Sequence, residues 1–461
     1  MAYHPKVLLK VIRLAYSRGI IGSRRIELAC RENILFMALA GGHQPDHSTI
    51  SAFVASMQDI IIDIFLQTLL VCSELNLLAG THFSLDGCKL PSNASKEYSG
   101  TFKELKKKRG KLKEKLTGLL NQHIITDQKD EDIHQVDKTK REKRIKRIKK
   151  QIERIEEFMK NNEPEKGKTR KEIQSNTTDN DSAKMPTAHG VIQGYNAQAV
   201  VDSKHQIIVH AEAMGNGQDA DNLKPMVEGL KQNLKAIGHT ENPVEGAILT
   251  ADSNYHTNEN IILCEQESMN AYIPDTNFRK RDVQFKGQGR FREGVNKPPK
   301  KKDNFEKYIL SDFIYDAKND VYLCPKGHSL KLETGHMVNR NTVYRVYRIK
   351  DDSCLECPLR DNCLSHKSAR QRYLCIPADS AGKPEEPLSP SVRMQHKIDS
   401  DQGKKIYGQR LGNIEPVFGN IRYNKHLNRF TYRTKVKVNT QWLLFCLIHN
   451  MEKIAHYGMA I

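Results

Sequence analysis

The chain has 461 residues, of which 73 are Lys or Arg and 55 are Asp or Glu, so its formal net charge is +18. Hydrophobic residues make up 38% and charged residues 28%, a composition that excludes wholesale disorder, collagen-like repeats and a membrane-spanning bundle. At this length about three domains are expected. No signal peptide is evident and the ten cysteines suit a reducing compartment, so we expect a cytoplasmic protein without a membrane partner.

The basic charge is concentrated in three segments. Residues 101–185 carry a net charge of +9, residues 277–304 carry +7 and residues 404–437 carry +8, whereas the rest of the chain carries −6. Such concentration is typical of a surface that follows a phosphate backbone and releases its counterions. Any single run could also be an ordinary solvated surface. The three runs together favour nucleic acid as the partner.

Residues 1–77 are predicted to form a helical domain, because apolar residues recur there at helical spacing. Gly41 and Gly42 interrupt the pattern, and Asp46 or Ser48 is expected to begin a long helix. Short helices around a glycine-rich turn are typical of a DNA-binding helix-turn-helix and also of a plain bundle. Spacing alone leaves both interpretations open.

Residues 99–185 are predicted to be an inserted basic coiled-coil hairpin. Apolar residues repeat there at three- and four-residue spacing, at Ile145, Ile148, Ile152, Ile155 and Met159. This spacing is the a/d pattern of a coiled coil. Upstream, Leu105, Leu112 and Leu119 repeat every seven residues, and the segment between the two repeats is polar. The alternative is a disordered charged insert.

The segments on either side of this hairpin are predicted to form an α/β core with a mixed sheet. Residues 78–98 contain its first strand, which is expected to end at Gly87, and residues 186–276 alternate strands with helices. Two predicted strands end in an aspartate, Asp86 and Asp252. Ligands and metals collect at such strand ends in α/β sheets. Each aspartate alone could equally be a cap or a turn residue.

Residues 277–400 are predicted to be a basic linker followed by a small zinc-ribbon-like insertion. A Cys-x-x-Cys pair with one cysteine before it and one after it suits a tetrahedral structural zinc. The expected ligands are Cys324, Cys354, Cys357 and Cys363, with His328 as a substitute. The alternative is a metal-free module with ordinary reduced thiols.

Residues 401–461 are predicted to be the C-terminal helical part of the core. Glu415 is the only acid within residues 404–437, which contain nine cations. A lone carboxylate in so basic a segment is held by salt bridges or by a bound cation. A pair of divalent ions needs several carboxylates that are distant in sequence and close in space. Glu415, Asp86 and Asp252 are candidates for such a set.

Several short motifs occur in a fixed order along the chain. They are Leu85-Asp86-Gly87, Gly194-Tyr195-Asn196, Thr250-Ala251-Asp252, and Tyr407, Arg410, Glu415 and Arg422 around Glu415-Pro416-Val417-Phe418-Gly419. In this order the motifs resemble those of bacterial insertion-sequence transposases of the DDE class, in the "eleven eighty-two" group with the Tyr-x-x-Arg…Glu…Lys/Arg signature. The resemblance covers nearly the whole chain.

The resemblance implies an RNase H-like catalytic core in which the first Asp lies on the first strand, the second at the end of the fourth, and the Glu on a later helix. Asp86, Asp252 and Glu415 match these positions and would hold two Mg²⁺ or Mn²⁺ ions for DNA cleavage and strand transfer. The DNA-contacting residues that it implies are Tyr407, Arg410, Arg422 and Lys425. The implied partners are double-stranded DNA, as element ends and as target, and further copies of the chain in a homodimer or higher oligomer.

Two details depart from the family pattern. Four residues separate Arg410 from Glu415, where three is commonest, and Pro416 directly follows the glutamate. Because proline in a helix interior costs about 3 kcal/mol, we expect Pro416 to lie in the first turn of a new helix. Two other functions stay open, namely a catalytically decayed DNA-binding regulator and an RNase H-like nuclease without strand transfer.

Overall fold

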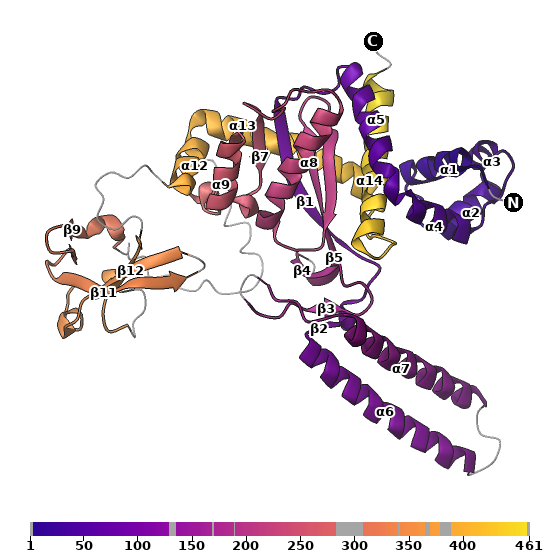
Figure 1. Ribbon diagram of the computed structural model, residues 1–461, viewed down its shortest axis with the longest axis horizontal. Helices are drawn as coiled ribbons and strands as arrows, with labels where there is room; N and C mark the ends of the chain where they lie inside the picture. Colours follow the sequence, from indigo (N-terminus) through magenta and orange to yellow (C-terminus); the bar gives the residue numbers. More distant parts are fainter. Residues whose placement is uncertain are drawn as a thin grey trace. The chain divides into compact units, whose positions relative to one another are not determined.

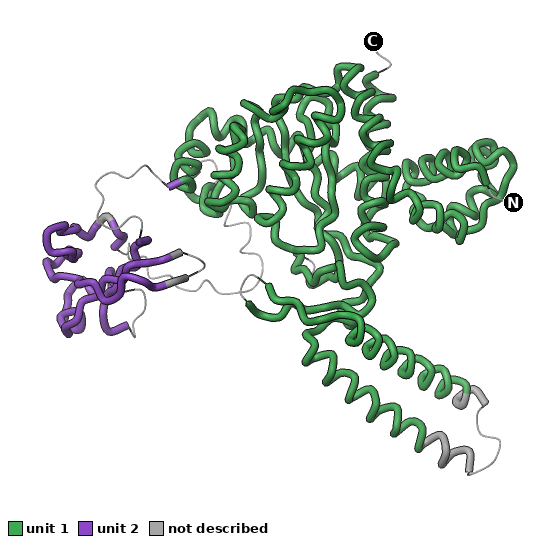
Figure 2. The backbone as a smooth tube through the Cα atoms, viewed as in Figure 1, with its two compact units in different colours: residues 1–282, 390–461 green, residues 283–389 purple. Residues whose placement is uncertain are grey.

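The computed structural model describes residues 3–128, 135–167, 170–188, 190–282, 308–339, 342–364, 369–378 and 389–458. The chain divides into two compact units (Figure 2). Unit 1 comprises Met1–Asp282 and Pro390–Ile461, and unit 2 comprises Val283–Ser389. Unit 2 falls within the cysteine-rich segment 277–400, whereas most of the basic run 277–304 lies outside the described residues.

Unit 1 begins with short helices. They are α1 (Pro5–Ser17), α2 (Ser23–Glu32), α3 (Ile34–Leu39), α4 (His47–Ser56), the 3₁₀ turn η1 (Met57–Asp59) and α5 (Ile61–Glu74). Asp46 caps α4 by accepting from the backbone N–H groups of Ser48 and Thr49. The long helix expected from this point is instead two helices bent by 72° at Ile60. In the described part of the chain no single helix is long and apolar enough to cross a membrane, although this bent pair reaches that length and composition.

The centre of unit 1 is a mixed sheet (Figure 1). Its strands are β1 (His82–Pro91), β4 (Ala183–Thr187), β5 (Gly190–Asp202), β6 (Ile207–Met214), β7 (Ile248–Ala251) and β8 (Asn270–Tyr272). β5 pairs antiparallel with β1, β4 and β6, whereas β7 runs parallel to β1 and β8. The predicted α/β architecture with a mixed sheet is therefore confirmed. The strand β1 was expected to end at Gly87. It instead continues to Pro91, because its pairing with β5 extends that far.

The sheet is accompanied by helices. They are α8 (Leu223–Ala236), preceded by the turn η3 (Asp219–Asn222), α9 (Asn258–Gln266), preceded by the turn η4 (Ser253–Tyr255), and then α10 (Phe278–Arg281), α12 (Pro390–Asp399), α13 (Asp401–Gly419), the π-helical turn η10 (Asn420–Asn424) and α14 (Lys435–Tyr457). α13 contacts β1 and β7, and α14 contacts β6 and α5. Trp442 of α14 is fully buried and donates from Nε1 to the Gln198 carbonyl oxygen at 3.0 Å.

Pro416 does not begin a new helix, contrary to the expectation, because α13 runs through it. A proline has no N–H, so the carbonyl oxygen of Gly412, four residues earlier, loses its helical partner. The Gln206 side chain supplies a replacement, since its Nε2 donates to that oxygen at 2.9 Å. This bond from the β5–β6 turn lets the helix continue past the proline.

The inserted segment between β1 and β5 is a helical hairpin. α6 (Phe102–Gln128) and α7 (Gln135–Asn161) lie side by side and contact each other (Figure 1). Leu105, Ile155 and Phe158 form the buried seam between them. The short strands β2 (Ser99–Gly100) and β3 (Ser175–Asn176) pair at the base of the hairpin.

Unit 2 is built on its own antiparallel sheet. The strands are β9 (Ile314–Asp316), β10 (Val321–Leu323), β11 (Ser329–Asn339), β12 (Thr342–Arg348) and β13 (Tyr373–Pro377), in the order β13-β12-β11-β10-β9. The turns η7 (Leu310–Asp312) and η8 (Asp352–Cys354) and the short helix α11 (Arg360–Cys363) complete the described part. A small separate core, including Leu330, Tyr347 and Ile376, holds the unit together.

Candidate active site

Asp86 and Asp252 are carried by neighbouring parallel strands. Ser84 of β1 lies opposite Thr250 of β7, and each aspartate follows two residues later. Side chains two residues apart on a strand share a face, so both carboxylates stand on one face where the pairing of β1 with β7 ends. The hydroxyls of Ser84 and Thr250 are hydrogen-bonded at 2.9 Å and are fully buried. The strand register thus fixes the spacing of the two acids.

Asp86 is paired with Arg410 of α13. Nη2 of Arg410 donates to Asp86 Oδ2 at 2.6 Å, and the Arg410 side chain is only 7% exposed. Burial raises the pKa of Asp86 to about 6, although Arg410 and the Gly87 N–H lower it, and the charges of Asp252 and Asp219 raise it further. Three carboxylates are therefore close enough to influence one another at this edge of the sheet.

Asp219 of η3 is not among the site residues predicted from the sequence, although its charge also raises the pKa of Asp86. Its Oδ1 accepts from Asn196 Nδ2 at 2.6 Å and from Gln198 Nε2 at 3.1 Å, and its Oδ2 accepts from Asn254 Nδ2 at 3.3 Å. Asn196 belongs to the Gly-Tyr-Asn motif, which is the one signal in the sequence that points to this place.

Glu415 lies elsewhere on α13. Its side chain is exposed, and no hydrogen bond or ion pair joins it to another side chain in the described residues. Tyr407 and Glu415 are eight residues apart, on one side of the helix and about 12 Å apart along its axis. Burial raises the pKa of Tyr407, the charge of Arg410 lowers it and the charge of Asp252 raises it. The roles of Tyr407 and Glu415 stay predictions.

The two other predicted DNA contacts differ in placement. Arg422 in η10 is half-buried, its guanidinium lies 6.0 Å from the Tyr423 ring centroid, and its Nε has no hydrogen-bond partner among the described residues. Lys425 has a side chain only 2% exposed, and its ammonium is paired with Glu452 and bonded to Asn420 Oδ1 at 3.3 Å. A buried ammonium that is already paired is not placed to contact a phosphate, so Lys425 has a structural position here.

The oxygen donors at the strand ends have the chemistry that a hard divalent ion prefers. Asp86 on β1 and Asp252, which directly follows β7, supply carboxylates. Among the residues that the structure describes, no three His, Cys, Asp or Glu side chains are arranged to hold an ion. The donor set therefore fits Mg²⁺ or Mn²⁺ in kind, with Asp86 engaged by Arg410 instead.

The four predicted zinc ligands in unit 2 line one small cavity of about 20 Å³, with His328 beside them. Burial raises the pKa of Cys363, Arg372 lowers it, and the charges of the three other cysteines raise it again. None of the four cysteines is in a disulfide. In the described residues, no group of three His, Cys, Asp or Glu side chains is arranged to hold an ion. The structure gathers these side chains without giving them coordination geometry.

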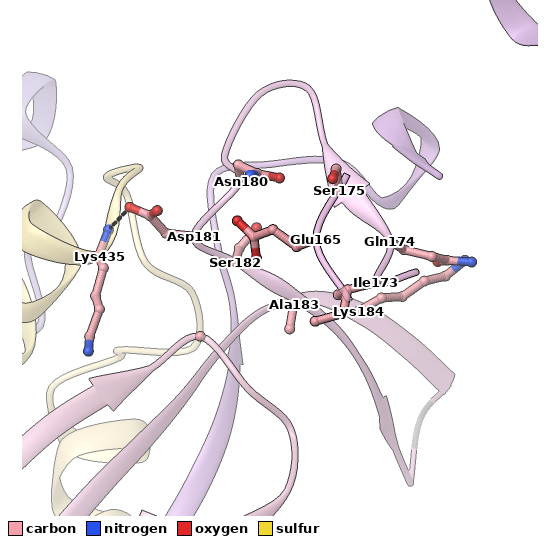
Figure 3. A pocket seen from close by; sticks show the side chains of 11 residues that line it. Glu165, Ile173, Gln174, Ser175, Asn180, Asp181, Ser182, Ala183, Lys184 and Lys435 are labelled. Carbon is pink, nitrogen blue, oxygen red and sulfur yellow. Dashed lines mark hydrogen bonds between the residues drawn. The ribbon is translucent and has the colours of Figure 1, made fainter. Parts of the chain in front are cut away.

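A larger cavity of about 570 Å³ lies at the base of the helical hairpin (Figure 3). Glu165, Asp181, Lys184 and Lys435 are among its lining residues. The Lys435 N–H donates to Asp181 Oδ2 at 2.7 Å, so part of its polar lining is used inside the protein. Neither Asp86 nor Asp252 lines this cavity.

Two family models match the chain. One, described as a transposase DDE domain, matches residues 323–455, and the other, described as a transposase domain (DUF772), matches residues 1–56. The first match includes the four cysteines and Glu415, whereas Asp86 and Asp252 lie before it. No curated protein matches the chain. Taken together, the two family matches indicate that the chain is an insertion-sequence DDE transposase.

Proposed function

We propose that the chain binds the terminal inverted repeats of its own element and catalyses metal-dependent DNA cleavage and strand transfer. The observation that carries this proposal is the pair Asp86 and Asp252, held on one face of neighbouring parallel strands. DNA is the substrate class of a transposase, and the basic runs in the sequence agree with it.

The sheet topology supports an RNase H-like core. Following the pairings, the strands lie in the order β6-β5-β1-β7-β8, with β6, β5 and β1 antiparallel and β1, β7 and β8 parallel. Asp86 lies on the first strand of this sheet and Asp252 directly follows β7, as the family resemblance implies. A later helix, α13, contributes Arg410 and Glu415.

The side chains at the strand ends would divide the work as follows. Asp86 and Asp252 would hold two divalent ions, with Glu415 as a third ligand after a change of position. Two such metal ions would lower the pKa of the attacking hydroxyl and stabilise the leaving oxygen. Arg422, whose Nε has no hydrogen-bond partner in the described residues, would contact the phosphate. Arg410 would do so only after its pairing with Asp86 is broken.

The helical hairpin would provide a second DNA contact. Lys146, Lys149 and Lys150 are exposed on α7, in the segment that carries a net charge of +9. Contacts of this kind depend on counterion release, so binding is expected to weaken steeply as salt is added. We also propose that Cys324, Cys354, Cys357 and Cys363 hold a structural zinc, because all four line one cavity.

The test is a comparison of DNA binding and cleavage by the full chain and by Asp86→Ala. The variant is expected to bind DNA that carries the element ends nearly as the parent does, and to lose Mg²⁺-dependent cleavage. Asp63→Ala is a matched control, because Asp63 is exposed on α5 in the N-terminal helices. Full cleavage by Asp86→Ala would refute the assignment of the site.

A further inference from the structure

We infer that Arg429 and Arg433 form a preorganised site for two phosphate groups of the DNA backbone. Both residues lie in the loop that joins η10 to α14. The inference rests on the proposed function and adds a DNA contact to it, because neither arginine is among the DNA contacts expected from the sequence.

The loop between η10 and α14 is fixed to the segment that follows β1. The Phe430 N–H donates to the Pro91 carbonyl oxygen at 2.9 Å. Asn93 Nδ2 donates to the Thr431 carbonyl oxygen at 3.1 Å. The side chains of Leu427 and Phe430 are fully buried in the core of unit 1. The backbone that carries the two arginines is therefore held in one position from both sides.

Each guanidinium is held by a backbone carbonyl oxygen of the same segment. Arg429 Nε donates to the Ser92 carbonyl oxygen at 2.9 Å. Arg433 Nε donates to the Asn93 carbonyl oxygen at 2.7 Å. Because the two acceptors are consecutive residues, the two guanidinium groups are anchored next to each other. The Nη groups carry the remaining N–H donors of each guanidinium, in a planar fork that matches the oxygens of a phosphate.

The charges of the two arginines are not neutralised. Both residues are exposed, and among the residues that the structure describes no Asp or Glu forms an ion pair with either of them. By contrast, Lys425 and Lys435 of the same stretch pair with Glu452 and Glu212. Residues 416–451 contain six Lys or Arg and no Asp or Glu. Such a surface attracts a polyanion, because binding releases counterions from DNA.

A purely structural role accounts poorly for two charged side chains at this place. The loop is already joined to the end of β1 by the Phe430 N–H and by the Asn93 side chain. A hydrogen bond from an exposed donor adds only about 1 kcal/mol or less to the stability of a fold. A carbonyl acceptor fixes the direction of a guanidinium but leaves its charge available, which is what a phosphate site requires.

The two arginines lie at a defined distance from the proposed catalytic site. β1 carries Asp86 and continues to Pro91, and Ser92 follows directly. At about 3.3 Å per residue, Ser92 lies about 20 Å from Asp86. A DNA duplex rises about 3.4 Å per base pair. A duplex that follows β1 would therefore present its phosphates to the two arginines about six base pairs from the cleaved bond.

The test measures how DNA binding by the full chain depends on salt, with labelled duplex DNA that carries the element ends and without Mg²⁺. Each phosphate contact contributes about 0.9 to the slope of log K against the logarithm of the salt concentration. Arg429→Gln and Arg433→Gln are each expected to reduce the slope by about 0.9, and the double variant by about 1.8. A parental slope in the double variant would overturn the inference.

Arg393→Gln is the matched control. Arg393 is also an exposed arginine, but its guanidinium is paired with both carboxylate oxygens of Glu265, so this variant is expected to keep the parental slope. Lysine at positions 429 and 433 keeps the charge and loses the Nε bond to the carbonyl oxygen, so Arg429→Lys and Arg433→Lys should also keep the slope. A structural role predicts instead that the Lys and Gln variants lower the thermal stability alike and leave the slope unchanged.

A second measurement uses the parent protein and serves if the double variant fails to fold in a thermal melt. Uncharged methylphosphonate linkages replace single phosphates of the element end, one position at a time. Binding is expected to weaken when the linkage lies about six base pairs from the cleaved bond. Weakening that is confined to the linkages next to the cleaved bond would contradict the inference.

Asp86→Ala distinguishes this inference from the proposed function. If Asp86→Ala loses cleavage while the double arginine variant keeps the parental salt slope, only the phosphate site is refuted. If Asp86→Ala cleaves fully while the arginine variants reduce the slope, the phosphate site is supported and the proposed catalytic site is refuted.

Discussion

Arg410 and Asp86 are 324 residues apart in sequence, and their side chains meet at 2.6 Å. The guanidinium is almost fully buried, whereas the carboxylate side chain is 24% exposed. The pair joins α13 to β1 at the point where β1 and β7 stop pairing. It gives Asp86 a cationic partner and joins the C-terminal part of unit 1 to the central sheet.

Arg410→Ala is expected to lower the free energy of unfolding at pH 7 by about 3 kcal/mol, because it leaves a largely buried carboxylate without its partner. Burial already raises the pKa of Asp86 to about 6, and loss of Arg410 raises it further. The folded state then binds a proton more readily than the unfolded state, so the loss should be smaller at pH 5. Urea unfolding at the two pH values measures this.

The control for this prediction is Arg31→Ala, which removes an exposed arginine paired with Glu27 on the surface of α2. Its effect on unfolding is expected to be smaller than that of Arg410→Ala. Equal losses for Arg410→Ala at pH 5 and pH 7 would contradict the assignment of the effect to ionised Asp86.

The Gln206–Gly412 bond is expected to matter only while Pro416 is present. Gln206→Ala should destabilise the fold by about 1–2 kcal/mol, because the Gly412 carbonyl oxygen loses its donor. In a Pro416→Ala background the backbone N–H of residue 416 can take over, so the same change should cost about 1 kcal/mol less. A double-mutant cycle from urea unfolding gives the coupling. Additive effects would show that Gln206 does not compensate for the proline.

Two buried histidines should make the fold sensitive to acid. Burial lowers the pKa of His210 to about 4 and that of His449 to about 3. Below about pH 6.5 the unfolded chain takes up protons that the folded chain refuses, so stability falls as the pH falls towards these values. The expected slope is about 1.4 kcal/mol per pH unit for each histidine.

The measurement is the free energy of unfolding between pH 7 and pH 5, with His449→Gln as the variant. His449 Nδ1 accepts from Asn420 Nδ2, and His449 Nε2 donates to the Gln206 carbonyl oxygen, so the variant should be less stable at pH 7. The free energy of unfolding of the variant should fall less steeply with falling pH than that of the parent, by about the contribution of one histidine. An unchanged slope would contradict the prediction.

The cysteine cavity predicts about one zinc per chain in protein prepared without chelators, since tetrahedral sites of four thiolates bind zinc strongly. Cys354→Ser is expected to lose the zinc and to lower the thermal stability of unit 2. Cys375→Ser is a matched control, because Cys375 is exposed on β13 and does not line the cavity. Metal analysis that finds no zinc in the parent protein would exclude this site.

The sequence predicted the parts of the fold that depend on local pattern. Alternating and continuous apolar runs located the strands that carry Asp86 and Asp252, and the spacing of isoleucines such as Ile152 located the hairpin.

The features that the sequence did not predict depend on contacts between distant elements. The Gln206 side chain bonds to the Gly412 carbonyl oxygen, 206 residues away, in the helix that contains Pro416. Lys425 is buried and paired with Glu452. Side-chain amides on β5 and η4 hold Asp219. No local periodicity reports such side-chain bonds, since each depends on how the strands and helices are packed.

The central claim is that the site at Asp86 and Asp252 cuts and joins DNA. The most direct measurement is to incubate the full chain with Mg²⁺, labelled DNA that carries the element ends and an unlabelled target duplex, and to separate the products by size. We predict cut ends and also labelled strands joined to the target, both absent with Asp252→Asn. Cut ends without joined strands would indicate a nuclease, and joined products that persist with Asp252→Asn would contradict the account.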